Sequence, residues 1–298
     1  MYIIKVSGGK EKFNPNKVYR TCRRAGADKT LAGEIAAKVE KQIYSGITTR
    51  EILRLILNLL SRDNPGAATR YSLKEAILQL GPGGFVFEKF IVRLLQSYGY
   101  QAWCPEIIRG ACVNHEIDIT ARADFSTEKL PFILPKPFLK NKSGRRHGKK
   151  ITYMVECKYH KTPGNRCDLK QTLYTWARFL DVQEGWRRGY CEKFNYPWLI
   201  SNTKFSQSAI EYAECKGMRL LGWRYPRRAG LEYLIGQKNF YPITILKTLD
   251  SDLREKLFFQ DIILCQDLTT IGEGILQRKI DVEDKKLGRL IKEAQSII

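Results

Sequence analysis

The chain has 298 residues, of which 43% are hydrophobic and 28% are charged, and it carries a net charge of +20 at neutral pH. This length and composition are typical of a folded globular protein with two or three compact units. The opening residues Met1-Tyr2-Ile3-Ile4-Lys5 lack the apolar core of a signal peptide, and no apolar stretch is long enough to span a bilayer. We therefore expect a cytoplasmic protein with no membrane partner, and the strong positive charge favours a polyanionic partner such as nucleic acid.

The cysteines are expected to be reduced thiols. Eight are present, and none forms a CxxC pair. Two groupings have the side chains of a zinc site: Cys104 with Cys112 and His115, and Cys157 with His160 and Cys167. Their spacings differ from those of zinc knuckles, so buried free cysteines are the favoured interpretation, and an iron–sulfur cluster on four cysteines is the remaining alternative.

The first segment is predicted to be a small hairpin followed by helices. A β-branched strand at 1–6 and a turn at 7–9 lead into a returning strand at 10–13. Apolar residues at helical spacing then mark three amphipathic helices, which begin near Asn14, before Ile35 and at the capping sequence Thr48-Thr49-Arg50-Glu51. A last helix is predicted over 67–80.

Gly81-Pro82-Gly83-Gly84 breaks the chain, and the pattern behind it alternates between helices and strands. Helices are predicted near 87–98, 169–180 and 206–216, and strands at 115–121, 151–157, 198–200 and 220–223. The order is that of an α/β sandwich with an αβββαβ core, and the region after it is helical. The prediction is therefore a multidomain protein with boundaries at 1–82, 83–235 and 236–298, in which 130–150 forms a surface hairpin or loop.

Charged residues on two of these strands form the most informative motif. Glu116-Ile117-Asp118-Ile119 is followed by Met154-Val155-Glu156-Cys157-Lys158. Alternation places Glu156 and Lys158 on one face of their strand, and Asp118 opposite its apolar neighbours. If the strands are adjacent, two carboxylates and an ammonium converge, as metal-assisted phosphodiester hydrolysis requires. The alternative is an ordinary exposed strand, on which Glu and Lys often alternate.

Four sequence blocks in this region resemble the Mrr-like branch of the restriction-endonuclease superfamily, whose motif is PD-(D/E)xK. They are Gly84-Phe85-Val86-Phe87-Glu88 through Gly99-Tyr100, Glu116-Ile117-Asp118, Val155-Glu156-Cys157-Lys158, and Ser201-Asn202-Thr203-Lys204-Phe205-Ser206 with Leu221. The resemblance covers about 83–225. Ile117 stands where the motif has proline, and the connection between Asp118 and Glu156 is long.

This resemblance implies a restriction-endonuclease-like sandwich with a site for Mg²⁺ or Mn²⁺. Asp118 and Glu156 would be the metal ligands and Lys158 the catalytic lysine. Glu88 either approaches the same site as a further catalytic residue or is a solvated helix residue, and Gln171 likewise either reaches the site or lies on a helix surface. Between Lys136 and Lys170 there are eleven basic residues and only two acidic ones, which suits contacts to a DNA backbone.

The N-terminal segment resembles the ATP-cone, a regulatory nucleotide-binding module. The resemblance covers about 2–80 and rests on Lys5-Val6-Ser7-Gly8, Phe13-Asn14, Lys17-Val18, Ile47-Thr48, Glu51-Ile52, Ala67-Ala68 and Tyr71. It implies that ATP or dATP binds near Lys5, Lys17, Arg20 and Arg24. Val6-Ser7 replaces the usual Arg-Asp pair, which puts nucleotide binding in doubt, and the alternative is a helical interaction domain. Gly144 to Lys150 does not form a P-loop.

The tail resembles a helix-hairpin-helix DNA-binding unit only weakly, because Ile280-Asp281-Val282 lacks the hairpin glycines. Taken together, the expectation is a magnesium-dependent DNA endonuclease, controlled by ATP or dATP, that acts in restriction, genome defence or DNA repair. A homodimer or higher homo-oligomer is expected, since cutting both strands needs two active sites. The alternatives are a nucleotide-responsive DNA-binding regulator with an inactive nuclease scaffold, and an RNase.

Overall fold

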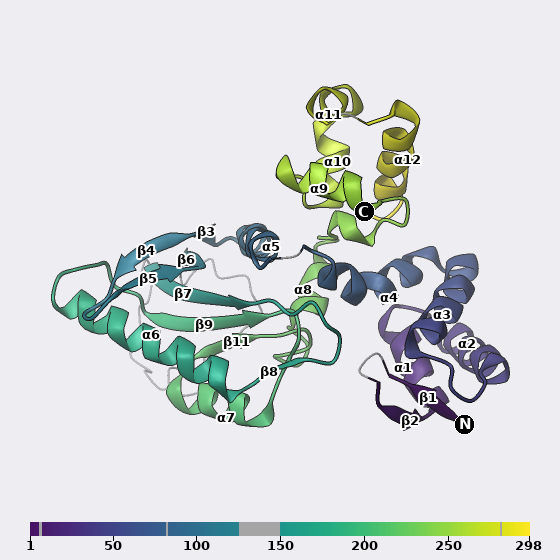
Figure 1. The fold of residues 1–298 in the computed structure, drawn as a ribbon, viewed down its shortest axis with the longest axis horizontal. Coiled ribbons are helices and arrows are strands. Elements are labelled where there is room, and N and C mark those ends of the chain that lie inside the picture. The colour runs from purple at the N-terminus through teal and green to yellow at the C-terminus, as the bar shows by residue number, and fades with distance from the viewer. Residues whose placement is uncertain (6–7, 82, 125–149, 281) are drawn as a thin grey trace. The chain divides into compact units, whose positions relative to one another are not determined.

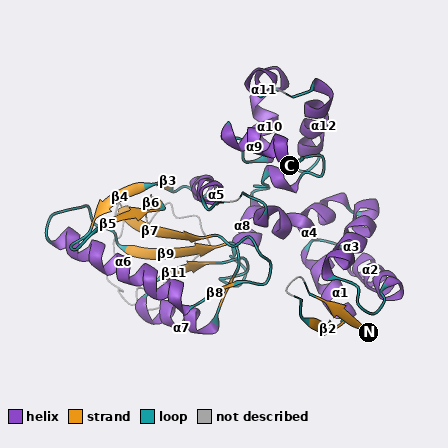
Figure 2. Ribbon diagram, viewed as in Figure 1, coloured by secondary structure: helices purple, strands orange, loops and turns teal. Residues whose placement is uncertain are grey.

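The structure, a computed structural model, describes residues 1–5, 8–81, 83–124, 150–280 and 282–298. The chain divides into two compact units (Figure 1): Met1–Gln79 with Tyr241–Ile298, and Leu80–Phe240. Strands are concentrated in the second unit, whereas the first is mainly helical (Figure 2). The chain has more than one compact unit, as expected, and the segments before and after the sheet are mainly helical. The three domains at 1–82, 83–235 and 236–298 stay a prediction. The predicted hairpin at 130–150 lies, except for Lys150, outside the described residues.

The N-terminal part of the first unit is the predicted hairpin and four helices. Strands β1 (Tyr2–Ile4) and β2 (Lys10–Lys12) pair antiparallel, with Tyr2 opposite Lys12. The helices are α1 (Pro15–Arg24), α2 (Lys29–Gln42), α3 (Thr49–Asp63) and α4 (Pro65–Leu78). The hairpin joins the helical part through main-chain bonds from Ile4 N to Ile47 O at 2.9 Å and from Gly46 N to Tyr2 O at 3.0 Å.

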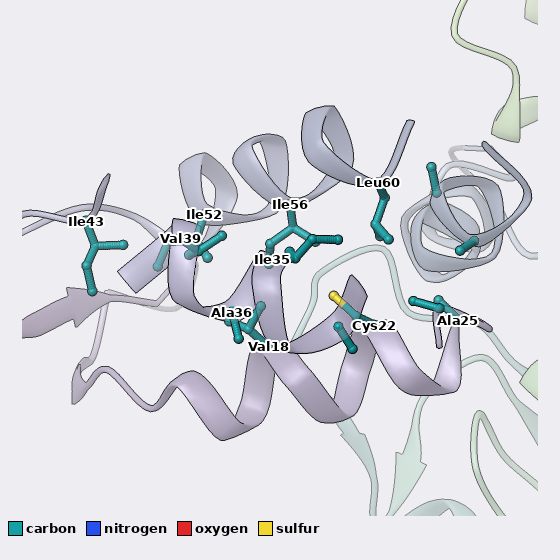
Figure 3. Packing of buried hydrophobic residues seen from close by; sticks show 14 of the residues in the cluster. Val18, Cys22, Ala25, Ile35, Ala36, Val39, Ile43, Ile52, Ile56 and Leu60 are labelled. Carbon is teal, nitrogen blue, oxygen red and sulfur yellow. The ribbon is translucent and has the colours of Figure 1, made fainter. Parts of the chain in front are cut away.

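Caps and one shared core explain why these helices begin and pack where they do. Asn14 and Asp28 accept main-chain N–H groups at the starts of α1 and α2, and Thr48 with Glu51 forms the predicted capping box of α3. Figure 3 shows Cys22 and other apolar side chains of the first three helices pointing into this core. Among the residues labelled there are Val18, Ile35, Val39, Ile52, Ile56 and Leu60.

The C-terminal part of the first unit is helical, as predicted. It comprises η2 (Ile243–Ile245), α9 (Ser251–Phe259), α10 (Cys265–Ile271), α11 (Glu273–Lys279) and α12 (Asp284–Gln295). The buried Thr244 hydroxyl donates to the Ala76 carbonyl at 2.8 Å, which ties η2 to the end of α4. Asp267 begins α10 by accepting the Ile263 and Leu264 N–H groups, both at 2.9 Å.

The second unit is built on a mixed five-stranded sheet in the order β11-β9-β7-β6-β3. Its strands are β3 (Gln101–Trp103), β6 (Ile119–Asp124), β7 (Lys150–Lys158), β9 (Tyr196–Ser201) and β11 (Arg219–Leu221). The β6 strand is antiparallel to both neighbours, while β7, β9 and β11 are parallel. Two small pairs flank the sheet: β4 (Glu106–Arg109) with β5 (Asn114–Ile117), and β8 (Arg166–Cys167) with β10 (Lys204–Phe205).

Helices cover this sheet. They are α5 (Phe85–Ser97), α6 (Leu169–Arg187) and α7 (Gln207–Lys216), and α8 (Leu231–Gln237) follows the last strand of the sheet in the chain. The α6 and α7 helices lie side by side, with α6 against β7 and β9 (Figure 1), whereas α5 packs on β3 and β6. Met154 packs with Phe179 of α6, so Glu156, two residues on, lies on the same face of β7 as Met154. The predicted helices and strands occur in the predicted order, but β3, β4, β8 and β10 are strands that the sequence analysis did not locate. The restriction-endonuclease-like sandwich stays a prediction.

One predicted strand is wrong in its extent. Residues 115–121 were expected to form a single strand, but the structure divides them into β5 and β6 at Asp118. The two parts have different partners, because β5 pairs with β4 whereas β6 pairs with β7 and β3. A change of partner requires a break in the ladder, and Asp118 occupies that break.

Candidate active site

Asp118 lies beside the second half of β7. Ile119 is opposite Val155 in the β6–β7 ladder, which brings the preceding Asp118 to the level of Glu156 and Cys157. The Asp118 carboxylate accepts the Cys157 main-chain N–H through Oδ2 at 2.7 Å. One carboxylate oxygen therefore holds the strand end in place, and Oδ1 has no hydrogen bond to a described residue.

The structure brings the four predicted catalytic residues into one electrostatic cluster. Glu156 and Lys158 come from β7, Asp118 from the β5–β6 break and Glu88 from the first turn of α5. The negative charge of Asp118 raises the pKa of both Glu88 and Glu156, and the charge of Glu88 also raises the pKa of Glu156. The Lys158 ammonium opposes this repulsion by lowering the pKa of Asp118 and of Glu156. Lys158 itself is exposed.

Burial and mutual repulsion make ionisation of these carboxyls unfavourable. Burial, then the charges of Asp118 and Glu116, raises the pKa of Glu88 from 4.5 to about 7. Burial, then Asp118, raises the pKa of Glu156 to about 7, even though Arg178 and Lys158 oppose the change. Burial also raises the pKa of Asp118, against the Cys157 N–H. Such a site favours either a proton or a cation.

Arg178 of α6 is a member of the cluster that the sequence reasoning missed. Its guanidinium forms an ion pair with Glu156 through Nη1 and donates to the Glu116 carbonyl through Nη2. Only 10% of the Arg178 side chain is exposed, and its Nε is buried with no hydrogen-bond partner among the described residues. Arg178 lies three residues after the buried Thr175 and four before the buried Val182, so it falls on the buried face of α6, where a charge requires a partner.

Gln171 does not extend the site. Its side-chain oxygen accepts the Asp168 N–H at 3.0 Å, and Asp168 accepts the Lys170 N–H at 2.9 Å. The two residues form the capping box of α6, so Gln171 serves the helix end.

Polar side chains after β9 fix the end of β7. The buried Ser201 hydroxyl donates to the Lys158 carbonyl at 2.8 Å. The Asn202 side chain accepts the His160 N–H at 2.9 Å and donates to the His160 carbonyl at 2.8 Å. These bonds hold the backbone on both sides of Tyr159, which positions Lys158 at the strand end.

The donor set suits a hard cation with few protein ligands. Asp118 and Glu156 offer oxygen ligands, and Mg²⁺ is commonly held by one or two carboxylates, with water and substrate phosphate completing its shell. Among the residues that the structure describes, no group of three His, Cys, Asp or Glu side chains is placed to hold a metal ion. Neither cysteine grouping considered as a zinc site gains support, and Mg²⁺ binding by Asp118 and Glu156 stays a prediction. All eight cysteines are free thiols.

The four predicted nucleotide-binding residues lie in or next to the hairpin and α1. Glu11 of β2 pairs with the Lys5 ammonium at 2.7 Å and also with Lys17. Arg24 donates to the Thr21 hydroxyl at 2.7 Å, and Arg20 is exposed on α1. Phosphate binding by Lys5, Lys17, Arg20 and Arg24 stays a prediction. Val6 and Ser7, which stand where the ATP-cone family usually has Arg-Asp, lie outside the described residues.

Comparison with known proteins identifies the class of protein. Residues 1–76 match the ATP cone domain family, and residues 241–298 match the family AF1548-like, C-terminal. The chain is thus a multidomain protein with an ATP cone domain at its N-terminus. Both family matches lie outside 80–240, so the Mrr-like assignment of that unit stays a prediction. No helix in the described part of the chain is long and apolar enough to cross a membrane.

The chain belongs to the AF1548-like family. An uncharacterized protein of Archaeoglobus fulgidus is 36% identical over 208 residues, which cover 70% of this chain and 99% of that protein. A crystal structure of a protein of unknown function, AF1548, matches with a TM-score of 0.55 and 33% identity, covering 72% of this chain and 98% of that one.

Proposed function

We propose that residues 80–240 form a divalent-metal-dependent DNA endonuclease, and that the ATP cone domain regulates it by binding ATP or dATP. The observation that carries the proposal is the convergence of Asp118, Glu156, Lys158 and Glu88, in which two carboxyls have a pKa of about 7. Three partly buried carboxyls in one cluster destabilise the fold unless something positive balances them. A divalent metal ion would supply that positive charge.

Each residue has a distinct task in this proposal. Asp118 and Glu156 would hold Mg²⁺ or Mn²⁺, and such a metal ion, when bound, polarises the phosphate and lowers the pKa of a water molecule. Lys158 is exposed at the strand end, where its ammonium can neutralise a phosphate oxygen or orient the attacking water. Glu88, with a pKa of about 7, is suited to take up a proton near neutral pH.

The net charge of +20 supports nucleic acid as the substrate class, because neutralising backbone phosphates releases counterions. DNA is proposed on the Mrr-like resemblance of 83–225, with roles in restriction, genome defence or DNA repair. An RNA substrate is the alternative that the charge supports equally.

A plasmid-cleavage assay tests the proposal. The wild-type protein should nick or linearise DNA in Mg²⁺ and lose this activity in EDTA. Glu156→Ala and Lys158→Ala should each lower the rate by about a hundredfold or more. Lys216→Ala is the matched control, because Lys216 is exposed on α7 of the same unit and lies outside both the cluster and the basic run at 136–170. Equal rates in the wild type, Glu156→Ala and Lys158→Ala would reject the site, and a labelled RNA in parallel tubes separates the two substrates.

A second candidate function follows from Arg178. Since Glu156 is already paired with a cation of the protein, the cluster is also consistent with a scaffold that has no catalysis. The protein would then be a nucleotide-responsive DNA-binding regulator. In that case no divalent ion yields cleavage, whereas ATP or dATP changes the affinity for DNA. Cleavage that depends on Glu156 and Lys158 excludes this function.

A further inference from the structure

The charges of α12 divide into two sets on different sides of the helix. On one side, Glu293 accepts the Lys247 and Thr248 N–H groups at 2.8 and 3.0 Å, and Lys286 forms an ion pair with Asp250. These contacts hold α12 against the loop at 247–250, which lies between η2 and α9. The remaining cations of the helix, Lys285, Arg289 and Lys292, form no ion pair with any described residue and are exposed.

The three unpaired cations line one groove. It measures about 630 Å³ and is bounded by α12 and the start of α11; the residues that line it are Glu273, Asp284, Lys285, Gly288, Arg289, Ile291, Lys292 and Gln295. The Glu273 side chain reaches over α12 at Gly288, where an added Cβ would lie 3.1 Å from Glu273 Oε1. Asp284 is in the first turn of α12, where the helix dipole favours a carboxylate.

The cations form a row along the helix. Lys285, Arg289 and Lys292 recur at intervals of four and three residues, so they share one face. At 1.5 Å per residue the row is about 10 Å long. A row of this length suits several successive phosphates better than a single phosphate group. Since these exposed cations form no ion pair with a described residue, they can contact a polyanion without first breaking an ion pair within that part of the chain.

We propose that the α11–α12 groove, defined by Lys285, Arg289 and Lys292, binds the phosphodiester backbone of nucleic acid. The choice of nucleic acid as the partner rests on the proposed function of residues 80–240, but binding in the groove requires no metal and no cleavage. The groove offers ammonium and guanidinium groups and lacks an exposed aromatic platform among its lining residues. It therefore contacts phosphates without reading base sequence.

The test is DNA binding by the full chain in EDTA, measured as fluorescence anisotropy of a short labelled duplex over a series of salt concentrations. Each phosphate contact contributes about 0.9 to the slope of log K against log salt. The triple variant Lys285→Gln/Arg289→Gln/Lys292→Gln should lower the slope by about 2.7 and weaken binding about tenfold or more at low salt. The matched control is Lys29→Gln/Lys41→Gln/Arg50→Gln, which removes the same charge from exposed positions on α2 and α3.

A variant that should bind DNA more tightly guards against the possibility that the triple variant loses binding because it is misfolded. Gln295 lines the groove one turn beyond Lys292, so Gln295→Lys should extend the row and increase the slope by about 0.9. An equal loss in the groove and control triples would show general electrostatic attraction only and would overturn the proposal, as would an unchanged slope in the groove triple. Binding is measured without metal and is therefore independent of cleavage. If the plasmid assay showed no cleavage while the groove variants still changed DNA binding as expected, the nuclease would be rejected and the groove would stand.

Discussion

The fold accommodates the charge of Glu88 poorly. It is partly buried, it faces the charges of Asp118 and Glu116, and it has no ion-pair partner among the described residues. Glu156 shares the raised pKa but is partly compensated by Arg178. The two carboxyls therefore differ in one respect. No cation offsets the rise in the pKa of Glu88, whereas Arg178 offsets part of the rise at Glu156.

Replacing Glu88 by Gln should stabilise the protein at high pH only. Folding raises the pKa of Glu88 from 4.5 to about 7, so its contribution to stability is fully present below about pH 4.5 and is lost as the pH rises through about 7. Glu88→Gln in EDTA should therefore raise the free energy of unfolding by about 1–2 kcal/mol at pH 8, allowing for partial solvent exposure, and by almost nothing at pH 4.5. Thermal unfolding at the two pH values measures this difference.

Glu211→Gln is the control, because Glu211 is exposed on α7 of the same unit and, among the described residues, its carboxylate accepts a side-chain hydrogen bond from Gln207 alone. Its effect should be small and independent of pH. A pH-independent change in Glu88→Gln would contradict the raised pKa of Glu88.

At the scale of the element, α6 organises much of the second unit. Its capping box fixes its first turn, Arg178 reaches the cluster, and Asp181 clamps the β4–β5 turn. The Asp181 carboxylate accepts the Cys112 and Val113 N–H groups at 2.9 and 3.4 Å and contacts His115 Nε2 at 2.8 Å. Burial raises the pKa of Asp181, but these hydrogen bonds outweigh it and lower the pKa to about 2. The clamp is therefore ionised at neutral pH.

Contact between α6 and the β4–β5 turn depends on a helical glycine. A Cβ at Gly185 would lie 2.7 Å from the Arg109 carbonyl and 2.8 Å from the Gly110 backbone, which is backbone that cannot move aside easily. Gly185→Ala should thus lower the free energy of unfolding by about 1–3 kcal/mol. Hydrogen exchange should show faster exchange at Gly110 and Ala111, because Ala111 N–H donates to the Asp181 carbonyl at 3.0 Å.

Gly236→Ala is the matched control for this prediction. Gly236 is also helical, and nothing lies within 4 Å of the Cβ that it would gain. Alanine has the higher helix propensity, so this variant should be neutral or stabilise by up to about 1 kcal/mol. Equal effects of the two substitutions would show that the close approach at Gly185 is unimportant.

At the scale of the whole molecule, the chain leaves the first unit after Gln79 and returns to it at Tyr241. The ATP cone domain at 1–76 and the C-terminal helices at 241–298 are thus parts of one compact unit, although the second unit separates them in sequence. Regulation of the second unit by a nucleotide requires different affinities for its active and inactive states.

Nucleotide binding should be visible as a stability change of the full chain. A ligand that binds only the folded state at about 100 times its Kd stabilises it by about 2.7 kcal/mol. ATP or dATP should therefore raise the melting temperature of the wild type, and Lys17→Ala should weaken the effect about tenfold or more in apparent Kd. Lys41→Ala, at an exposed position of α2, should retain it. Absence of both a melting shift and calorimetric heat in the wild type would favour the helical interaction domain instead.

Much of this protein was predictable from local sequence patterns. The hairpin, the capping box at Thr48 and Glu51, the breaker before α5 and the alternation that places Glu156 and Lys158 on one face depend on neighbours a few residues apart. Such neighbours are in contact in any chain with that helix or strand, so spacing alone indicates their arrangement.

Other features were decided only by packing. The break at Asp118 follows from a change of strand partner, the entry of Arg178 into the cluster follows from where α6 lies on the sheet, and the pKa of about 7 at Glu88 follows from burial beside other carboxyls. The sequence by itself determined most of the helices, the hairpin, the strands near 151–157, 198–200 and 220–223, and the list of charged residues. Tertiary structure decided which charges meet, because electrostatic energy depends on distances across elements that no local spacing encodes.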